Sequence, residues 1–572
     1  MKKYIILFVA VCLSLTTFSQ AQLISQEVEN HIQARVESGV NVGIVVGMID
    51  DETIEYYSFG TTAAKSGKPV DEHSVFEIGS ISKVFTTTLL ADEVLKGHMA
   101  LTDLASKYLP KSVTLPTRNG KEITLNDLAT HTSALPRMPD NFNPKDPLNP
   151  YVDYTPTMMY AFLNQLELTR DIGVKYEYSN LGMGLLGHIL ELHTGKTYET
   201  LIKERITTPC GMPNTALKLS DNMRNHLANG HSEGVQVSNW DFDVIASAGG
   251  IRSTAIDMIS FLKANLEISK TPINPAMQLA HQEAFSNADS TFNIGLGWHH
   301  EKKGNVTWHN GRTGGYTSFT GFVQGTKKGV VVLTNATENI NALGFHLLGS
   351  PTPLVNPKPS IVMLLKKEIS KNGVDSAIAL YHQTKKATPN DYVFNESELN
   401  RLGYEYLNVD KNAIAFKLFQ LNANTFPESS NVFDSLAEVY LKQGDSALAS
   451  SNYKKSLKLN PANENAKVVL KSIGVDVSDI VSDMEVSEAV LETYLGAYQL
   501  APDFIITVTR DGTQLLAQAT GQPQFQLFPS AEHKFYLKAV DAQVTFHVTN
   551  EGVVESLTLH QNGQNIPGNK IE

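Results

Sequence analysis

The segment from Phe76 to Lys83 holds a serine and a lysine at a spacing that suits nucleophilic chemistry. Ser80 follows Gly79 directly and precedes Lys83 by three residues, at the expected start of a helix. Residues three apart share one face of a helix, so the Lys83 side chain can reach the Ser80 hydroxyl. A serine hydroxyl becomes a good nucleophile when a neighbouring base removes its proton, and a lysine held neutral can do this. The segment therefore predicts an activated serine.

The spacing alone is a weak signal, because a chain of 572 residues should contain S-x-x-K roughly two or three times by chance. It occurs at Ser80, Ser260 and Ser451. Ser260 lies inside an apolar helical run and Ser451 inside a helical repeat, so both are expected to be structural. Ser80 differs because two further groups of residues accompany it along the chain.

The first accompanying group is Tyr176–Asn180, which precedes a helix rich in small residues. A tyrosine, a spacer and an asparagine on a loop can bring a phenol and a carboxamide into one cleft. The Tyr178 phenol can relay protons if nearby ammonium charge lowers its pKa, and the Asn180 carboxamide can hold an amide substrate. By itself, such a triplet is more often a surface turn with a buried tyrosine.

The second accompanying group lies in Val306–Phe319. An alternating strand is expected to end at His309, to pass Gly311 and to resume at Thr317–Val323. A glycine in a strand allows another backbone or a ligand to approach closely. An edge strand of this kind can present a backbone N–H to a developing oxyanion, beside the N–H of Ser80. Without its companions, His309 would be interpreted as an ordinary strand histidine.

In this order, S-x-x-K, Y-x-N and H-x-G resemble the active-site motifs of the class C β-lactamase family, which includes related penicillin-binding proteins, D-amino-acid peptidases and serine esterases. The segments Ile123–Pro136, Ala248–Asp257 and Gly295–Trp298 resemble structural landmarks of the family. The resemblance covers residues 25 to 348. It implies an α+β fold, in which an antiparallel sheet is flanked by helices and a helical lobe.

The resemblance also implies roles for the residues of the first two motifs. Ser80 would be the acylated nucleophile, and Lys83 and Tyr178 would act together as the general base. Asn180 would orient the substrate amide. The expected chemistry is therefore acyl transfer through an ester at Ser80.

The third motif departs from the Lys-Thr-Gly of typical β-lactamases, because this chain has His309-Asn310-Gly311. By position, His309 replaces the substrate-binding lysine and Gly311 lies beside it. The backbone N–H groups of Ser80 and Arg312 would form the oxyanion hole. A neutral imidazole anchors a substrate carboxylate less well than an ammonium, and its charge changes within physiological pH. The Arg312 guanidinium could supply a forked cation instead.

These motifs predict a serine hydrolase that cleaves an amide or an ester, with a β-lactam, a D-amino-acid peptide or a small ester as substrate. Acyl transfer to an amine or alcohol stays open, because the same acyl-enzyme serves both reactions. A different interpretation is a catalytically silent scaffold that binds a protein or peptide through helical repeats. Such a scaffold would need none of Ser80, Lys83 and Tyr178.

The first residues have the pattern of a secretory signal. A basic start at Lys2 and Lys3 precedes an apolar run from Tyr4 to Leu15, and Ser19-Gln20-Ala21 resembles a cleavage site. Residues 1–21 are therefore predicted to be a signal peptide. We expect a secreted protein, in a bacterial periplasm, with no membrane anchor in the mature chain.

Composition gives little reason to expect a cofactor or a nucleic-acid partner. The formal net charge of −12 disfavours nucleic acids and anionic membranes. Cys210 is left without a partner once the signal containing Cys12 is removed, and we interpret it as structural. No histidines have metal-ligand spacing, and His299-His300 is interpreted as a solvated loop. We predict no metal and no organic cofactor.

Three further boundaries follow the hydrolase domain predicted at residues 22–348. A proline-rich linker is expected at 349–360 and a tetratricopeptide-like array at 361–474, because similar residues recur at an offset of 34. The array could bind a peptide or act as a spacer. Residues 485–572 contain short alternating runs separated by turns, which predict a small antiparallel barrel or sandwich resembling lipocalin-like tail domains.

Overall fold

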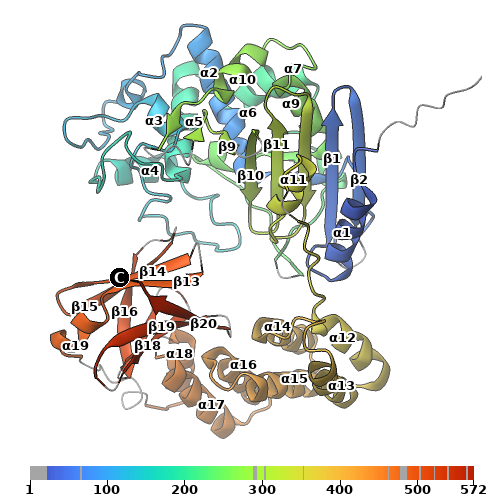
Figure 1. Ribbon diagram of the computed structural model, residues 1–572, viewed down its shortest axis with the longest axis vertical. Coiled ribbons are helices and arrows are strands. Elements are labelled where there is room, and N and C mark those ends of the chain that lie inside the picture. The colour runs from blue at the N-terminus through green and yellow to red at the C-terminus, as the bar shows by residue number, and fades with distance from the viewer. Residues whose placement is uncertain are drawn as a thin grey trace, which may run out of the picture. The chain divides into compact units, whose positions relative to one another are not determined.

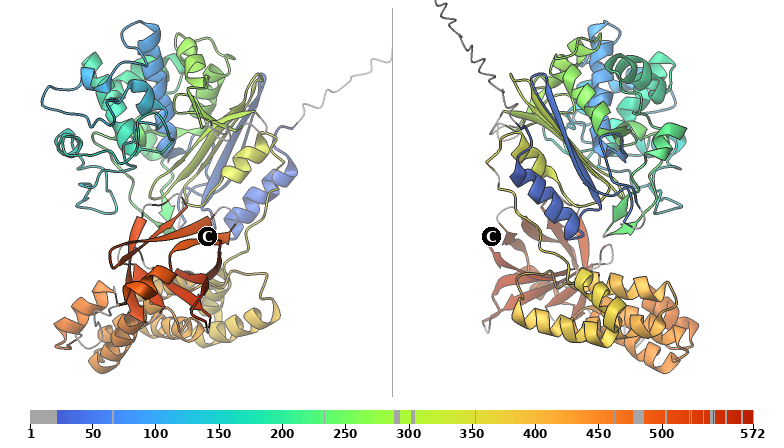
Figure 2. Two further views of the ribbon diagram at one scale, coloured as in Figure 1. Left: turned by 60° about the vertical axis from the view of Figure 1, so that its left-hand side comes forward. Right: turned by 90° about the vertical axis from the view of Figure 1, so that its right-hand side faces the viewer.

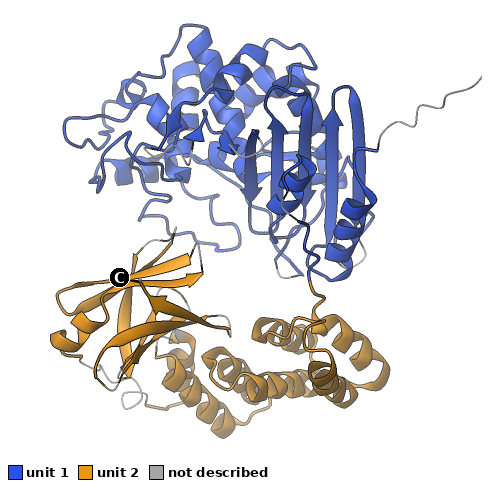
Figure 3. Ribbon diagram, in the orientation of Figure 1, with its two compact units in different colours: residues 1–357 blue, residues 358–572 orange. Residues whose placement is uncertain are grey.

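In the computed structural model the chain divides into two units, residues 1–357 and 358–572 (Figure 3). The structure describes residues 22–64, 67–232, 234–287, 293–301, 305–351, 353–461, 463–476, 486–501, 504–520, 522, 524–531, 533–537, 540, 542–549, 551–561 and 564–571. The predicted signal peptide lies outside these residues. In the described part of the chain, no helix is long and apolar enough to span a membrane.

The centre of the first unit is an antiparallel sheet with the strand order β2-β1-β12-β11-β10-β9-β8-β7 (Figure 1). Its strands are β1 Gly43–Asp50, β2 Thr53–Gly60, β7 Phe285–Ser286, β8 Asn293–Ile294, β9 His299–Glu301, β10 Val306–Arg312, β11 Thr317–Val323 and β12 Lys328–Thr334. The N-terminal hairpin of β1 and β2 pairs with β12, the last of these strands in the sequence, and Ile44 lies opposite Thr334. The predicted sheet built from both ends of the domain is therefore confirmed.

The two faces of the sheet are covered by different helices (Figure 2). On one face, Val46 and Val332 pack with helices α1 (Gln26–Glu37) and α11 (Asn341–Leu347). On the other face, alternate residues of the same strands join the core formed with α9 (Ala255–Asn265) and the helical lobe. The strands are apolar on both sides because both faces are buried.

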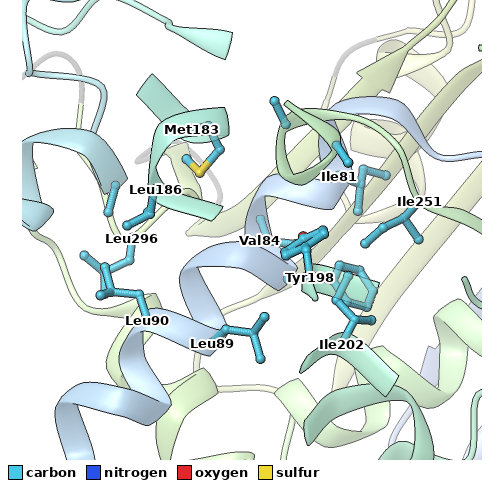
Figure 4. Packing of buried hydrophobic residues seen from close by; sticks show 14 of the residues in the cluster. Ile81, Val84, Leu89, Leu90, Met183, Leu186, Tyr198, Ile202, Ile251 and Leu296 are labelled. Atoms are coloured by element: carbon cyan, nitrogen blue, oxygen red, sulfur yellow. The ribbon is translucent and has the colours of Figure 1, made fainter. Parts of the chain in front are cut away.

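The helical lobe forms around α2 (Ser82–Leu95), in which every residue from Ser82 to Glu93 is buried (Figure 4). Its buried residues include the apolar Val84, Leu89 and Leu90 and also polar ones, and the hydroxyls of Thr86 and Thr88 donate hydrogen bonds to backbone carbonyls. The other helices of the lobe are α3 Leu125–Ala129, α4 Pro156–Leu163, α5 Asn180–Thr194, α6 Tyr198–Ile202, α7 Thr208–Cys210, α8 Asp221–Asn225 and α10 Asn274–His281. The short pairs are β3 Val75–Glu77 with β6 Arg252–Thr254, and β4 His231–Ser232 with β5 Val235–Gln236.

In the described residues of the second unit, seven helices, α12 to α18, and the short helix α19 (Glu488–Thr493) precede a closed eight-stranded barrel. The helices are α12 Ile361–Asn372, α13 Val374–Ala387, α14 Glu396–Leu407, α15 Asn412–Thr425, α16 Ser430–Lys442, α17 Ser446–Leu459 and α18 Glu464–Ser472. Their starts repeat every 34 residues from Glu396 to Ser430 to Glu464, and from Asn412 to Ser446. The period agrees with the predicted repeat, while membership of the tetratricopeptide class stays a prediction.

The barrel follows the short helix α19 (Glu488–Thr493). Its strands are β13 Gly496–Ala501, β14 Phe504–Asp511, β15 Gln514–Ala519, β16 Gln524–Ala531, β17 Lys534–Leu537, β18 Ala542–Val548, β19 Val554–Gln561 and β20 Gln564–Lys570. β13 pairs with both β14 and β20, so the sheet closes. Of the two predicted architectures, barrel or sandwich, the barrel is the one present. β20 contains Pro567 and Gly568 and has few apolar residues, so its sequence shows little of the alternation expected of a strand.

A buried ion pair between Glu77 of β3 and Arg252 of β6 holds the loop that follows β5. Glu77 Oε1 accepts hydrogen bonds from Asn239 Nδ2 and Trp240 N, both at 2.9 Å, and lies 3.4 Å from Arg252 Nη2. Glu77 is 3% exposed and Arg252 is 4% exposed. Because Arg252 also binds Asp241 and the Trp240 carbonyl, this pair fixes the loop beside the Ser80 turn.

Replacing Glu77 with alanine should destabilise the protein by about 3 kcal/mol, because the Arg252 charge would stay buried without this carboxylate. Urea unfolding measures the change. The control is Asp241→Asn: the Asp241 side chain is 59% exposed, so its loss should cost less than about 1 kcal/mol. Equal effects of the two substitutions would contradict the structural role given to Glu77.

Candidate active site

Ser80 lies in the 3₁₀ turn Gly79–Ile81 that leads into α2, and not in the α-helix itself. Ser82 holds this turn: its hydroxyl donates to the Gly79 carbonyl (2.7 Å) and accepts from Ile251 N (3.0 Å). Lys83 is in the first turn of α2, so the three-residue spacing brings its side chain to Ser80. The predicted juxtaposition is present.

Lys83 Nζ lies 3.0 Å from Ser80 Oγ and donates to the Ala248 carbonyl at 2.6 Å. The Lys83 side chain is fully buried. Burial, and then the positive charge of Arg137, hold the pKa of the Lys83 amine well below its ordinary value. A neutral amine can keep its bond to Ala248 and direct its lone pair at the Ser80 hydroxyl. The site thus contains a base within hydrogen-bond distance of the nucleophile.

The Tyr178 ring lies over the same lysine, with Lys83 Nζ 4.7 Å from the ring centroid. The phenol hydrogen-bonds with Ser80. Burial raises the pKa of Tyr178, and the bond to Ser80 and the charge of Arg137 oppose this rise only in part. The expectation that nearby positive charge lowers the pKa of the Tyr178 phenol is therefore wrong for the resting site. The pKa shifts favour a protonated Tyr178 and a neutral Lys83 amine.

The Tyr178 loop is held by the segment from His131 to Arg137. Ser179 N donates to His131 Nδ1 (3.1 Å), and Asn180 N donates to the Arg137 carbonyl (3.0 Å). The Ser179 hydroxyl accepts from Gly182 N and so caps α5, which begins at Asn180. The His131 ring packs against Tyr178 with centroids 4.5 Å apart. The predicted loop residue Asn180 is thus the first residue of a helix.

The strand β10 continues through His309 to Arg312, so the expected end of the strand at His309 is wrong. Only its first half pairs with β9, up to Trp308 opposite His299. The edge beyond Trp308 is not paired with β9. Because β9 begins at His299, opposite Trp308, β10 is an edge strand from His309 to Arg312. The predicted edge strand is therefore present at the motif residues.

Two glycines let the backbone of β10 approach the Ser80 turn. A Cβ on Gly311 would lie 2.0 Å from the Ile78 carbonyl oxygen, and one on Gly79 would lie 2.8 Å from Arg312 N. Gly79 also has a φ of +51°, which disfavours other residues. This contact brings the backbone N of Arg312 next to the turn that carries Ser80. It is the approach that an oxyanion hole from these two residues requires.

His309 is buried and neutral. Its Nδ1 lies 2.6 Å from the Asn310 carbonyl, so Nδ1 carries the hydrogen and Nε2 the lone pair. Burial, and then the neighbouring His299 and Lys83, hold the pKa of His309 well below its ordinary value. The expectation that its charge changes within physiological pH is wrong, because an imidazole with no access to water resists protonation.

His299 was expected in a solvated loop, and this prediction is also wrong. It lies in β9, its ring stacks on His309 with centroids 5.0 Å apart, and its Nε2 lies 3.0 Å from the Tyr176 hydroxyl. Burial lowers the pKa of His299 to about 4. The charged residues that follow it in the sequence suggested exposure, but pairing with Trp308 of β10 places His299 in the sheet.

Sequence reasoning also missed Arg137 and an aromatic wall. The cleft at Ser80 has a volume of about 30 Å³ and is lined by Tyr151, Trp240 and Phe242, together with Asn180 and Arg312. The rings of Tyr151 and Phe242 stack at 4.8 Å. Nothing in the sequence pattern connects these aromatic residues with Ser80, because they lie on loops far apart in the chain.

In the described residues, one group of side chains has the donors for a metal ion: Glu93, His98 and His193. It lies at the far end of α2, away from Ser80. Arg205 already pairs with Glu93 at 2.7 Å, and the His98 ring lies 2.9 Å from the same carboxylate. Hydrogen bonds and an ion pair therefore explain the cluster without a metal.

A model of the β-lactamase family matches residues 28–344, more than half of the chain. The chain belongs to the β-lactamase family. A second model, described as a domain of unknown function (DUF3471), matches residues 483–570.

Relatives agree with this family membership. The chain is 29% identical over 391 residues to the D-alanyl-D-alanine-carboxypeptidase/endopeptidase AmpH of Escherichia coli (strain K12), covering 62% of this chain and 100% of that protein. It is 29% identical over 293 residues to a β-lactamase of the same organism, covering 50% of this chain and 73% of that protein.

Solved structures show the same fold. A class C β-lactamase has a TM-score of 0.51 and 23% identity, covering 58% of this chain and 97% of that one. A β-lactamase/D-alanine carboxypeptidase from Pseudomonas syringae has a TM-score of 0.51 and 20% identity, covering 58% of this chain and 100% of that one. The predicted class, a serine hydrolase related to class C β-lactamases, is thereby confirmed for this member of the β-lactamase family.

Gly311→Ala should slow acylation of Ser80 by about a hundredfold, because the new methyl group would push β10 away from Ile78 and displace the Arg312 N–H. The rate of labelling by a fluorophosphonate measures this. The control is Gly329→Ala in β12, whose Cβ would meet only the flexible ends of side chains, the nearest at 3.2 Å. Similar rates for both variants would argue against the close approach as a catalytic requirement.

Proposed function

We propose that this protein is a secreted serine hydrolase that cleaves peptides ending in D-alanine through an acyl-enzyme at Ser80. The observation that carries the proposal is the buried Lys83 amine 3.0 Å from Ser80 Oγ, beneath the Tyr178 ring. A buried lysine next to a hydroxyl has no evident structural purpose, since its desolvation is costly. The same group is the general base that acyl transfer from a serine needs.

In acylation, Ser80 Oγ attacks the substrate carbonyl carbon while its proton passes to Lys83 Nζ. The negative charge that develops on the carbonyl oxygen is held by the N–H groups of Ser80 and Arg312. The carbon–nitrogen bond then breaks, and the leaving amine takes a proton from the Lys83 and Tyr178 pair. The product is an ester between Ser80 and the acyl half of the substrate.

In deacylation, water replaces the departed amine. Lys83 and Tyr178, having returned a proton to the leaving group, can accept one from this water as it attacks the ester carbon. The bond between that carbon and Ser80 Oγ then breaks, the pair passes the proton to Ser80 Oγ, and the acid product leaves the free enzyme. Asn180 lines the cleft beside Ser80, where its carboxamide can hold the substrate amide. His309 offers a neutral acceptor in this site, and Gly311 keeps the strand close.

A peptide amide is the first substrate class to test because the match to the carboxypeptidase/endopeptidase AmpH covers that whole protein. The substrates of relatives named β-lactamases come second. The neutral His309 leaves the third motif without the ammonium of Lys-Thr-Gly, which weakens the case for β-lactams as natural substrates.

The proposal extends to the parts of the chain outside the catalytic unit. Residues 1–21 would be removed as a signal peptide, and the mature domain would span 22–348 before a linker at 349–360. The helices at 361–474 are proposed to bind a protein or peptide partner, and residues 485–572 form the third domain. Neither the motifs nor the contacts above require an added cofactor.

The test is intact-mass spectrometry of the mature protein after incubation with a fluorescent penicillin or a fluorophosphonate, with Ser80→Ala as control. We expect one adduct per chain that is lost in Ser80→Ala. Lys83→Met and Tyr178→Phe should slow its formation by about a hundredfold or more. Release of D-alanine from a pentapeptide by the wild type then tests the substrate.

Each outcome of this test separates two hypotheses. An adduct with fluorophosphonate alone would favour an esterase or a peptidase with a restricted pocket. Acylation without D-alanine release would reject the peptide substrate and keep the serine mechanism. Failure of both reagents on the folded wild type would favour the silent scaffold.

A further inference from the structure

Arg137 holds a positive charge against the catalytic tyrosine. Its guanidinium carbon lies 5.1 Å from the centroid of the Tyr178 ring, a distance typical of a cation–π contact. The backbone carbonyl of Arg137 accepts a hydrogen bond from Asn180 N at 3.0 Å. This bond ties the arginine to the loop that positions both Tyr178 and Asn180.

No carboxylate of the described residues lies within ion-pair distance of Arg137. Arg170, by contrast, is 2.9 Å from Glu177 in the same region, so its charge is balanced. The Arg137 side chain is exposed, and without an anionic partner among these residues its charge is not neutralised by an ion pair. Such a charge is useful where negative charge develops during a reaction.

Burial favours the neutral forms of the other basic side chains at the centre of the site. Burial lowers the pKa values of Lys83, His131 and His309 well below their ordinary values, and that of His299 to about 4. Arginine side chains stay charged at all physiological pH values. Arg137 and Arg312, both exposed, are therefore the fixed cations at the site, and Arg137 is the one whose guanidinium lies over the Tyr178 ring.

Resting on the acyl-enzyme mechanism proposed above, we propose that Arg137 is a positioning residue that stabilises negative charge on Tyr178 during proton transfer. It acts through Tyr178 and Lys83 and need not touch the substrate.

The electrostatic effects on both partners have the required direction. The Arg137 charge lowers the pKa of Tyr178, since it favours the phenolate, and lowers the pKa of Lys83, since it disfavours the ammonium. Both changes increase the fraction of the pair that can accept a proton at a given pH. Removing the charge should raise both pKa values and move the acidic limb of the pH–rate profile to higher pH.

The experiment measures the second-order rate of Ser80 acylation against pH in wild type, Arg137→Gln, Arg137→Lys and Arg170→Gln. Arg137→Gln should move the acidic limb upward by about one pH unit and lower the rate on that limb about tenfold. Arg137→Lys should recover part of the shift because it restores the charge. Arg170→Gln should leave the profile in place, because the charge it removes is already paired with Glu177.

A fluorophosphonate without a carboxylate and a fluorescent penicillin with one are both used as acylating reagents. The same shift with both reagents supports the proposal. Slower reaction with penicillin alone, at an unchanged profile, would show that Arg137 binds substrate anions and would overturn it. An equal loss at every pH would mean a purely structural role and would also overturn it. Circular dichroism and thermal melting establish that each variant is folded.

The failure of this proposal can be told from the failure of the proposed function. If the wild type forms no Ser80 adduct, the acyl-enzyme mechanism is wrong. If it does form one and Arg137→Gln keeps the wild-type profile, only the role of Arg137 is wrong.

Discussion

The desolvation of one lysine is the constraint on which the site depends. Moving an ammonium out of water costs several kcal/mol, so a lysine in this position is far cheaper to bury as an amine. α2 is the most enclosed helix of the lobe, and this enclosure is what keeps water from the Lys83 side chain. The Ala248 carbonyl then fixes the direction of the amine. The packing that buries α2 is therefore also what makes Lys83 a base for Ser80.

The second requirement of the site is that the backbone of β10 lies close to the backbone of the Ser80 turn. The Ser80 turn and β10 come from parts of the chain more than two hundred residues apart. They meet closely only because Gly79 and Gly311 lack a Cβ. Ser318 adds a hydrogen bond from β11 to the Ile78 carbonyl at 2.8 Å, which holds the turn against the sheet. The precision of the site thus comes from the rigid sheet rather than from loops.

The sequence was a good guide where chemistry and periodicity are local. The three-residue spacing of Ser80 and Lys83 and the 34-residue period of the helices both depend on neighbours in the chain. It failed where burial is decided by distant segments. His299 lies beside charged residues in sequence but packs against His309 and Tyr176. The charge state of a histidine depends on such packing, and so His309 was also misjudged.

Arg137 shows the same limit from another side. Its position six residues after His131 carries no recognisable pattern, and its side chain is exposed like that of an ordinary surface arginine. Its relation to Tyr178 exists only because the two loops are joined by backbone hydrogen bonds. The spacing of residues in a sequence does not predict which charged side chains lie close together in the folded protein.

The pairing of β1 with β12 has a consequence for the folding of the chain. β1 leaves the ribosome early, yet its partner strand ends at Thr334, so Ile44 waits for almost the whole catalytic domain to be synthesised. Until then, the apolar residues of both faces of β1 have no lasting cover. Contacts this far apart in sequence make folding slow and leave the growing chain open to aggregation. The enzyme cannot assemble its nucleophile progressively, and activity should arise in one late step.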